Sequence, residues 1–309
     1  MKLAPALARL FLPLAALFAL AAPAPAQQGL PSPQMELTGP VAVHARPALW
    51  QVADDDTTIY LFGTVHALPP EIEWFDVDLA DRLARSDELV TEIPEVSDQE
   101  RAEVVLKYGI LPGSKSLRAG LTKAENAKLA KALKSLRLAP TAVDRYRPWF
   151  AAVNLVLRKF ELAGYTRMLG VEEVLAGRAR ELGKRRIGLE TLDQQIAMFA
   201  GFPPAVQKRY LFETIDALPQ VEPEMGKIIK AWSAGDADQL AALLNSEEDD
   251  PAMMEVLFTK RNKAWARWLK ARLDRPGTVF VAVGAGHLGM KGSVQDELAA
   301  LGLKVSRVQ

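Results

Sequence analysis

Two apolar runs of the sequence end in the same phrase, Gly-x-x-His, although they lie more than two hundred residues apart. Residues 60–66 read Tyr-Leu-Phe-Gly-Thr-Val-His, and residues 280–287 read Phe-Val-Ala-Val-Gly-Ala-Gly-His. Short apolar runs that stop at a glycine are typical of strands. Because the chain holds only three histidines, two of them in one local context indicate a shared role. The third, His44, lies in a stretch without apolar periodicity, and we treat it as incidental.

The rest of the sequence alternates between strand patterns and helix patterns. A hairpin is predicted over residues 48–62, and further strands over 88–91, 184–189, 279–283 and 303–308. Helices are predicted over 78–85, 123–137, 140–162, 171–182 and 293–301. Several more helices are predicted between 192 and 272, with breaks at 201–204, 219–223, 235 and 251. This alternation predicts an α/β fold of mixed α+β type, in one domain over 48–309 with a helical insertion over 97–165.

Four of the predicted strands lead into a residue that can bind a metal ion or move a proton. These residues are His66, Glu92, Glu190 and His287. In open α/β sheets, ligands bind just beyond the carboxyl ends of the strands, so neighbouring parallel strands would bring the four together. Imidazole and carboxylate ligands suit a divalent ion such as Zn, Mn or Co, which makes hydroxide available by lowering the pKa of bound water. The alternative is that each histidine only makes a loop hydrogen bond.

An arginine interrupts the apolar stripe of the predicted helix over residues 253–273. Arg261 falls on that stripe, and a buried arginine needs a partner because an unpaired charge is costly to desolvate. Either the side chain reaches solvent, or it pairs with a carboxylate such as Glu92 or Glu190. Asn262 beside it can donate or accept a hydrogen bond at a pocket wall.

The N-terminus has the composition of an export signal. A basic start, an apolar run over residues 10–22 and a small-residue exit predict a secretory signal peptide over 1–26, cleaved after Ala26. The alternative, a membrane anchor, is disfavoured because the run is too short to span a bilayer, so we expect no stable membrane insertion after cleavage. Residues 27–47 read as a flexible linker. We expect a periplasmic or secreted bacterial protein.

The composition excludes several functional classes. The chain has no cysteine, so it has neither a lipoprotein anchor, nor a disulfide, nor a thiol nucleophile. Basic and acidic residues balance at 38 each, which gives no indication of a nucleic-acid partner.

Five motifs together resemble the TraB/GumN family (TraB/PrgY/GumN), which is related to the Tiki metalloproteases. The motifs lie, in order, at residues 60–66, 89–92, 188–195, 261–262 and 281–288. The resemblance implies a sheet core similar to those of erythromycin esterase and the haem-binding ChaN proteins. It also implies a protease-like site that uses Mn or Co, with the two Gly-x-x-His histidines and the two acidic residues at the motif positions. The chain departs from the pattern at residues 289–292, Gly-Met-Lys-Gly, where a Pro-Gly turn is expected.

The leading hypothesis is an exported metal-dependent hydrolase, a peptidase acting on a peptide or small-molecule substrate. His66, Glu92 and His287 would bind the divalent ion, Glu190 would act as general base or orient a ligand, and Arg261 would stabilise a developing oxyanion.

Two other classes of protein stay open. One is a binding module that holds haem, a lipid or a peptide in the same crevice, under a helical lid carrying Trp149 and Phe150. The other is an interaction protein that sequesters a peptide through the lysine-rich helix of Lys128, Lys131 and Lys134, although such a run is more often a solvated face.

Overall fold

The computed structural model describes residues 42–244 and 251–309. The predicted signal peptide, and the predicted linker up to residue 41, lie outside the described residues. The end of that linker is structured: β1 (Val43–His44) pairs in parallel with β4 (Ile72–Glu73), and Ala45 is buried. Regular structure therefore begins before the predicted domain boundary at residue 48.

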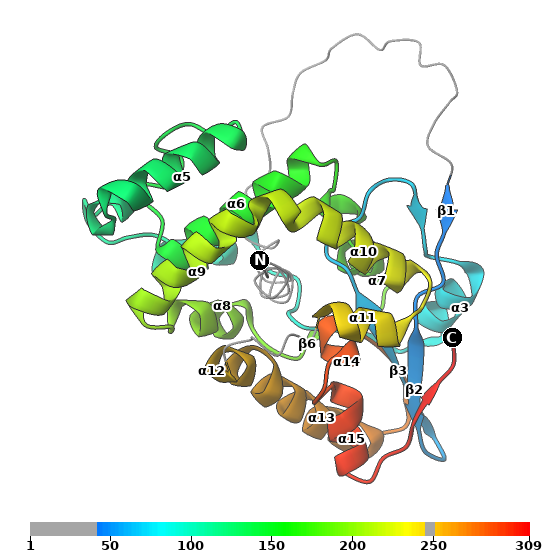
Figure 1. Ribbon diagram of the computed structural model, residues 1–309. Helices are drawn as coiled ribbons and strands as arrows, with labels where there is room; N and C mark the ends of the chain where they lie inside the picture. The colour runs from blue at the N-terminus through cyan, green and yellow to red at the C-terminus, as the bar shows by residue number, and fades with distance from the viewer. Residues whose placement is uncertain (1–41, 245–250) are drawn as a thin grey trace.

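A six-stranded mixed sheet forms the centre of the molecule, with strand order β6-β5-β7-β3-β2-β8 (Figure 1). Its strands are β2 (Leu49–Ala53), β3 (Thr57–Thr64), β5 (Glu88–Thr91), β6 (Arg185–Gly188), β7 (Gly277–Gly284) and β8 (Val305–Arg307). The first two form the predicted antiparallel hairpin. β6, β5, β7 and β3 run parallel to one another, so their carboxyl ends lie at one edge of the sheet. The predicted α/β class is confirmed.

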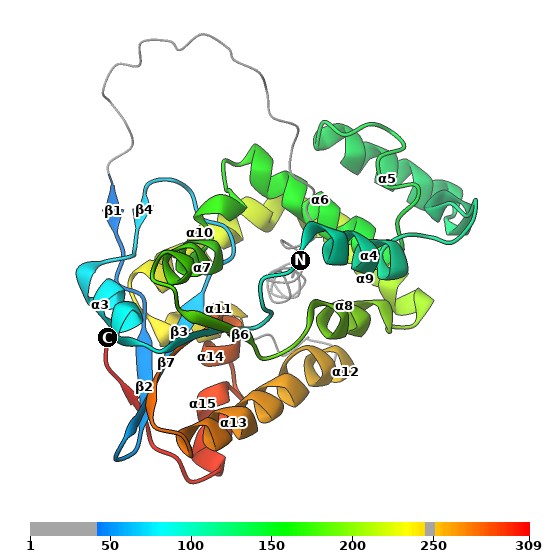
Figure 2. The ribbon, with the colours of Figure 1, turned by 180° about the vertical axis from the view of Figure 1, so that it is seen from behind.

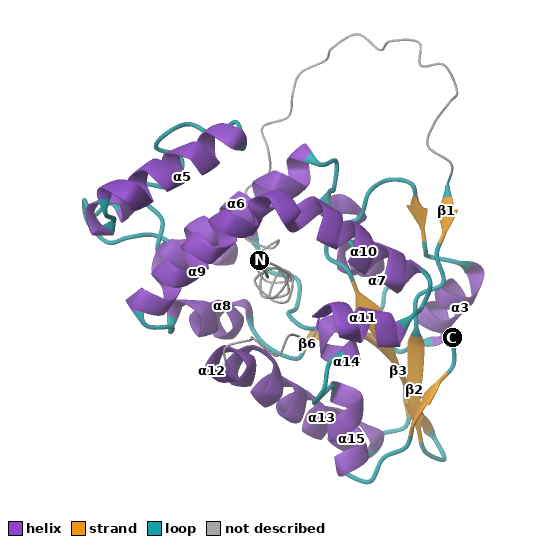
Figure 3. Ribbon diagram, viewed as in Figure 1, coloured by secondary structure: helices purple, strands orange, loops and turns teal. Residues whose placement is uncertain are grey.

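Helices cover both faces of this sheet (Figure 3). The helices of the described residues are α3 (Val77–Arg85), α4 (Asp98–Tyr108), α5 (Lys123–Ser135), α6 (Pro148–Leu162), α7 (Val171–Glu181), α8 (Leu192–Ala200), α9 (Pro204–Ala217), α10 (Val221–Ser233), α11 (Ala237–Leu244), α12 (Pro251–Met254), α13 (Lys260–Leu273), α14 (Gly286–Gly289) and α15 (Val294–Ala300). Some of them, such as α5, pack on other helices and lie away from the sheet. Among the described residues, no helix combines the length and the apolar character needed to cross a bilayer.

Alternating side chains of the central strands pack into two separate cores. Ile59 and Leu61 of β3 face α13 and α15, whereas Phe62 faces the core that α3 and α7 share with the larger helical region. Strands buried on both faces read as nearly continuous apolar runs, which explains the two runs in the sequence. Seen from behind, α7 lies over the β5–β6 side of the sheet (Figure 2).

The helical region differs from the prediction in one boundary. The helix predicted over 140–162 begins at Pro148, and residues 140–147 form turns. Proline is favoured in the first turn of a helix because it lacks the N–H that would stay unsatisfied there. α6 packs on α9, so the helices after residue 165 share a core with the predicted insertion.

The aromatic pair proposed as a lid belongs to this core. Trp149 and Phe150 are 1% and 5% exposed, and the Trp149 indole donates to the Tyr108 carbonyl at 3.1 Å. The interpretation that they form a ligand-facing lid is therefore wrong.

Candidate active site

The four predicted residues lie at the carboxyl edge of the parallel strands. His66 follows β3 by two residues, Glu92 follows β5 directly, Glu190 follows β6 by two residues and His287 lies in α14 just after β7. Arg261 of α13 bridges three of them. The structure thus brings together all five residues to which the sequence assigned a role.

Two glycines allow the strand ends to approach one another. A Cβ added to Gly63 would lie 3.2 Å from both Cα and Cβ of Ala285, so the two Gly-x-x-His loops touch through this glycine. A Cβ added to Gly284 would lie 3.0 Å from Glu92 Oε1 and 3.5 Å from His66 Nε2. A methyl group at Gly284 would therefore push against the site itself.

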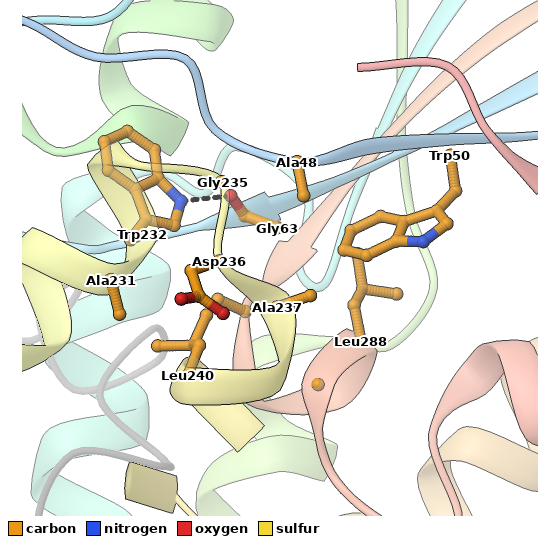
Figure 4. Close-up of a pocket in the computed structure, with 12 residues that line it drawn as sticks. Ala48, Trp50, Gly63, Ala231, Trp232, Gly235, Asp236, Ala237, Leu240 and Leu288 are labelled. Carbon is orange, nitrogen blue, oxygen red and sulfur yellow. Dashed lines mark hydrogen bonds between the residues drawn. The ribbon is translucent and has the colours of Figure 1, made fainter. Parts of the chain in front are cut away.

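A small apolar cavity lies behind the first of these loops (Figure 4). Its volume is about 20 Å³ and its walls include Trp50, Trp232, Leu240 and Leu288, so it has room for about one water molecule. The Trp232 indole donates to the Gly63 carbonyl at 2.8 Å, which fixes the turn leading to His66. The cavity supports the loop and is too small to bind a substrate.

Arg261 is the centre of a buried ionic network. Its side chain is 5% exposed, and it donates from Nη2 to Glu92 Oε2 at 2.6 Å and from Nε to Glu190 Oε1 at 2.8 Å. Nη1 lies 3.0 Å from His287 Nε2 and donates to the Leu257 carbonyl at 3.0 Å. That carbonyl lies in a π-helical turn, Glu255–Thr259, an irregularity frequent at functional sites. Of the two readings left open by the sequence, pairing with the carboxylates is confirmed.

Glu92 is held as a carboxylate by three donors. Besides Arg261, it accepts from Gln195 Nε2 at 2.7 Å and from the Gly284 backbone N–H at 2.8 Å. Burial alone would raise its pKa, but the charge of Arg261 and the surrounding donors outweigh burial and lower the pKa of Glu92 to about 2. Glu92 therefore stays ionised at every physiological pH.

Glu190 is more tightly enclosed than a solvent-facing base would be. Its Oε1 accepts from Arg261 and also from the Trp265 indole at 3.1 Å. Burial, the largest influence, raises the pKa of Glu190 in spite of the opposing charge of Arg261. The carboxylate is engaged by protein donors, which suits a positioning role.

His287 is locked as a neutral imidazole. It is 1% exposed, and its ring packs against the rings of Phe258 and Trp265. The distances between ring centroids are 4.8 and 4.4 Å. Asn262 donates from Nδ2 to the Gly292 carbonyl at 2.7 Å, so its Oδ1 faces His287 Nδ1 at 2.6 Å and accepts that proton. His287 Nε2 then accepts from Arg261. Burial and the charge of Arg261 lower the pKa of His287 to about 3.

His66 has the opposite environment, because Glu172 lies against its Nδ1. The Thr64 hydroxyl donates to the same carboxylate oxygen. Burial, the largest single influence, disfavours the imidazolium, but the charge and hydrogen bond of Glu172 and the charge of Glu92 outweigh it, so the pKa of His66 is raised above 6.5. Carboxylate–histidine pairs of this kind fix the tautomer and increase the basicity of the ring.

The sequence analysis missed Glu172. It lies in the first turn of α7, where acidic residues are common for helix-dipole reasons alone, so its presence in the sequence carried no specific signal. Gly170 lets the start of α7 approach the loop that carries His66. A Cβ at Gly170 would collide with the His66 carbonyl, and the Val171 N–H donates to the Val65 carbonyl at 3.0 Å. Glycine at the start of α7 thus lets the helix rest on the His66 loop.

A cavity of about 490 Å³ opens beside this pair. His66, Glu92 and Glu172 line it, and Glu190, Arg261 and His287 are not among its lining residues. The site therefore has two layers: the pair of His66 and Glu172, which lines the cavity, and an ionic network behind it that joins the strand ends.

The hydrogen bonds of the three predicted metal ligands decide whether a divalent ion fits among them. Both ring nitrogens of His287 are engaged by Asn262 and Arg261, and the guanidinium of Arg261 touches Glu92. An ion shared by His66, Glu92 and His287 would stand beside a positive charge and would have to displace it. Across residues 42–244 and 251–309, no group of three or more His, Asp or Glu side chains is arranged to hold a metal ion. This donor set does not suit a three-ligand metal site.

Comparison with known proteins gives one match. The model of the TraB/PrgY/gumN family matches residues 48–307. No curated protein and no solved structure matches the chain.

Proposed function

Because that match spans most of the chain, the protein belongs to the TraB/PrgY/gumN family, and we propose that it is a hydrolase whose general base is His66. The substrate would bind in the cavity lined by His66, Glu92 and Glu172. The observation that carries the proposal is the pairing of His66 Nδ1 with Glu172 at the wall of a cavity large enough for a small peptide.

The pair has the features that acid–base catalysis requires. Glu172 holds the ring in one orientation by accepting from Nδ1, so Nε2 is the nitrogen that exchanges a proton with the substrate side. Histidine titrates close to neutral pH, and the raised pKa of His66 makes its ring a better proton acceptor than a free imidazole. Glu92, ionised and nearby, stabilises the imidazolium formed after proton uptake.

The reaction we propose is hydrolysis of an amide or ester bond. His66 Nε2 takes a proton from water while the water oxygen adds to the acyl carbon. The same proton passes from Nε2 to the leaving nitrogen or oxygen, the bond from that atom to the acyl carbon breaks, and a carboxylic acid and an amine or alcohol are released.

The network behind His66 acts by positioning. Arg261 donates to two carboxylates and to His287, so its nitrogens are engaged within the protein rather than directed at the cavity. We therefore assign Arg261 a positioning role in place of the oxyanion role expected from sequence, and Glu190 a positioning role in place of general base.

The divalent metal ion predicted from the sequence is the alternative to this mechanism. Metal content of the purified mature protein, compared with a His66→Ala/His287→Ala double variant, tests it together with activity in the presence of a chelator. We expect substoichiometric metal in both proteins. Stoichiometric Mn, Co or Zn that disappears in the double variant would support the metal-dependent route over ours.

The hydrolase proposal is tested by kinetics. A library of short peptides and their esters, assayed with the mature protein, should contain substrates whose turnover falls at least ~10²-fold in His66→Gln. His44→Gln is the matched control, since His44 is an exposed histidine whose side chain is 83% accessible and pairs with Glu73. Turnover that His66→Gln leaves unchanged would contradict the proposal. Tight binding without turnover would favour the ligand-binding alternative instead.

Export also remains a proposal. The predicted signal peptide motivates it, and a mature chain in the periplasm or medium is the location in which we expect the hydrolase to act.

A further inference from the structure

The wall of the catalytic cavity carries a basic group that the proposed chemistry does not use. Arg101 lies in the first turn of α4 and lines the same cavity as His66. Its side chain is 20% exposed, so most of the guanidinium is enclosed.

Arg101 lacks a good partner of its own. Its Nε is buried and has no hydrogen-bond acceptor within the described part of the chain. Its nearest carboxylate contact places Nη1 at 3.8 Å from Oδ1 of Asp98, whose side chain is 93% exposed. Exposed pairs at such distances contribute little, whereas a buried donor without an acceptor is costly to desolvate.

The other arginines of the wall are already paired. Arg180 donates to Glu95 Oε1 at 2.8 Å, and Arg186 contacts the other oxygen of the same carboxylate. Arg167 lies 3.6 Å from Glu173. Arg101 is thus the arginine of this wall best placed to receive an acceptor from a ligand.

We propose that Arg101 binds a carboxylate of the substrate, which makes the protein selective for acidic substrates; this inference rests on the proposed hydrolase function. A planar guanidinium matches a carboxylate through two parallel hydrogen bonds. The carboxylate would come either from a peptide C-terminus or from an acidic side chain.

The charges around the cavity favour a single carboxylate over a phosphate. Five acidic side chains line the same cavity: Glu92, Glu95, Asp98, Glu172 and Glu173. A dianionic group would meet repulsion from these carboxylates, whereas a monoanion held by Arg101 keeps its charge beside a guanidinium whose nearest carboxylate contact is 3.8 Å long.

Equilibrium binding tests this selectivity independently of turnover. The probes are tripeptides with an uncharged dansyl label in matched sets: neutral side chains with a free C-terminus, neutral side chains with a C-terminal amide, and one glutamate with a C-terminal amide. Fluorescence anisotropy with the mature protein should show at least one acidic set binding about 10-fold or more tightly than the neutral amide. Whichever acidic set binds identifies the source of the carboxylate.

Variants assign the effect to Arg101. Arg101→Gln should abolish the preference and Arg101→Lys should restore part of it. Arg85→Gln is the matched control, because Arg85 is exposed on α3 and pairs with Asp81, and it should behave as the wild type. Equal binding of acidic and neutral sets by the wild type, or a preference that survives Arg101→Gln, would overturn the inference.

The same probes separate this inference from the hydrolase proposal. Selective binding without turnover would contradict only the hydrolase. Turnover of neutral and acidic peptides with equal kcat/KM would contradict only the carboxylate site. If both hold, Arg101→Gln should raise KM for acidic peptides and leave kcat within a few-fold of the wild type.

Discussion

Replacing Arg261 by methionine removes the positive charge from the buried network and keeps an unbranched side chain in its place. Glu92 and Glu190 then stay enclosed, 5% and 13% exposed at their side chains, without the cation that both contact. Removing one partner of a buried ion pair costs ~3–5 kcal/mol, because the remaining charge is stranded. We expect Arg261→Met to lose that much free energy of unfolding at pH 7.

The pH dependence of the loss distinguishes this cause from a simple packing defect. In the wild type, the pKa of Glu92 is lowered from 4.5 to about 2, so its contribution of about 3 kcal/mol is fully present above pH 4.5 and is lost as pH falls through about 2. Glu190, whose pKa is raised, acts in the opposite direction. Without Arg261, burial raises the pKa of both carboxyls, so the variant becomes more stable as pH falls from 7 to 5.

Urea unfolding followed by far-UV circular dichroism at pH 5, 6, 7 and 8 measures both effects. Adding Glu92→Gln to Arg261→Met should recover part of the lost stability at pH 7, because the amide resembles the protonated carboxyl. A loss at pH 7 below ~1 kcal/mol, the size of an exposed pair, would refute the buried-network reasoning. A loss of unfolding free energy that is the same at pH 5 and pH 8 would also refute this reasoning.

Three further predictions concern the pair of His66 and Glu172, the loop that carries His66, and export. Glu172→Gln should lower kcat/KM by ~10²-fold and move the acid limb of its pH profile to lower pH, since Glu172 raises the pKa of His66 against burial; an unmoved limb would show that another group titrates. Gly170→Ala should cost ~2 kcal/mol or more of unfolding free energy and reduce activity, because the methyl group meets the His66 carbonyl. Gly177→Ala on the same helix, which has open space around it, should be neutral or gain ~0.5–1 kcal/mol. N-terminal sequencing of exported protein should begin at Gln27, and a chain that keeps its first residues would contradict the predicted cleavage.

Strand ends could be predicted from the sequence because their signal is local. Continuous apolar runs ending at Gly63 and Gly284 reported two strands buried on both faces, and parallel pairing then forced their ends to one edge. Arg261 was recognised in the same way, because a charge on an apolar stripe requires a partner. Each of these inferences rests on the residues of a single helix or strand.

The pairing of His66 with Glu172 could not be found in that way. Glu172 reaches His66 only because α7 begins on the His66 loop, an arrangement decided by tertiary packing and by Gly170. The start of α6 was predicted wrongly for a related reason. Residues 140–147 are mostly compatible with a helix, but they form turns before Pro148. Nor did spacing reveal that Arg261 would donate to both Glu92 and Glu190.

The repeated phrase Gly-x-x-His thus serves two different electrostatic purposes. Each glycine lets a strand end turn closely past its neighbour, so both histidines arrive at the same edge. His287 then contacts the guanidinium of Arg261 and the Asn262 amide, and burial together with the charge of Arg261 lowers its pKa to about 3. His66 meets the Glu172 carboxylate, which raises its pKa and leaves the ring at the wall of the cavity. A metal site would need both rings to present a lone pair to one ion, whereas Arg261 already donates to the lone pair of His287 Nε2.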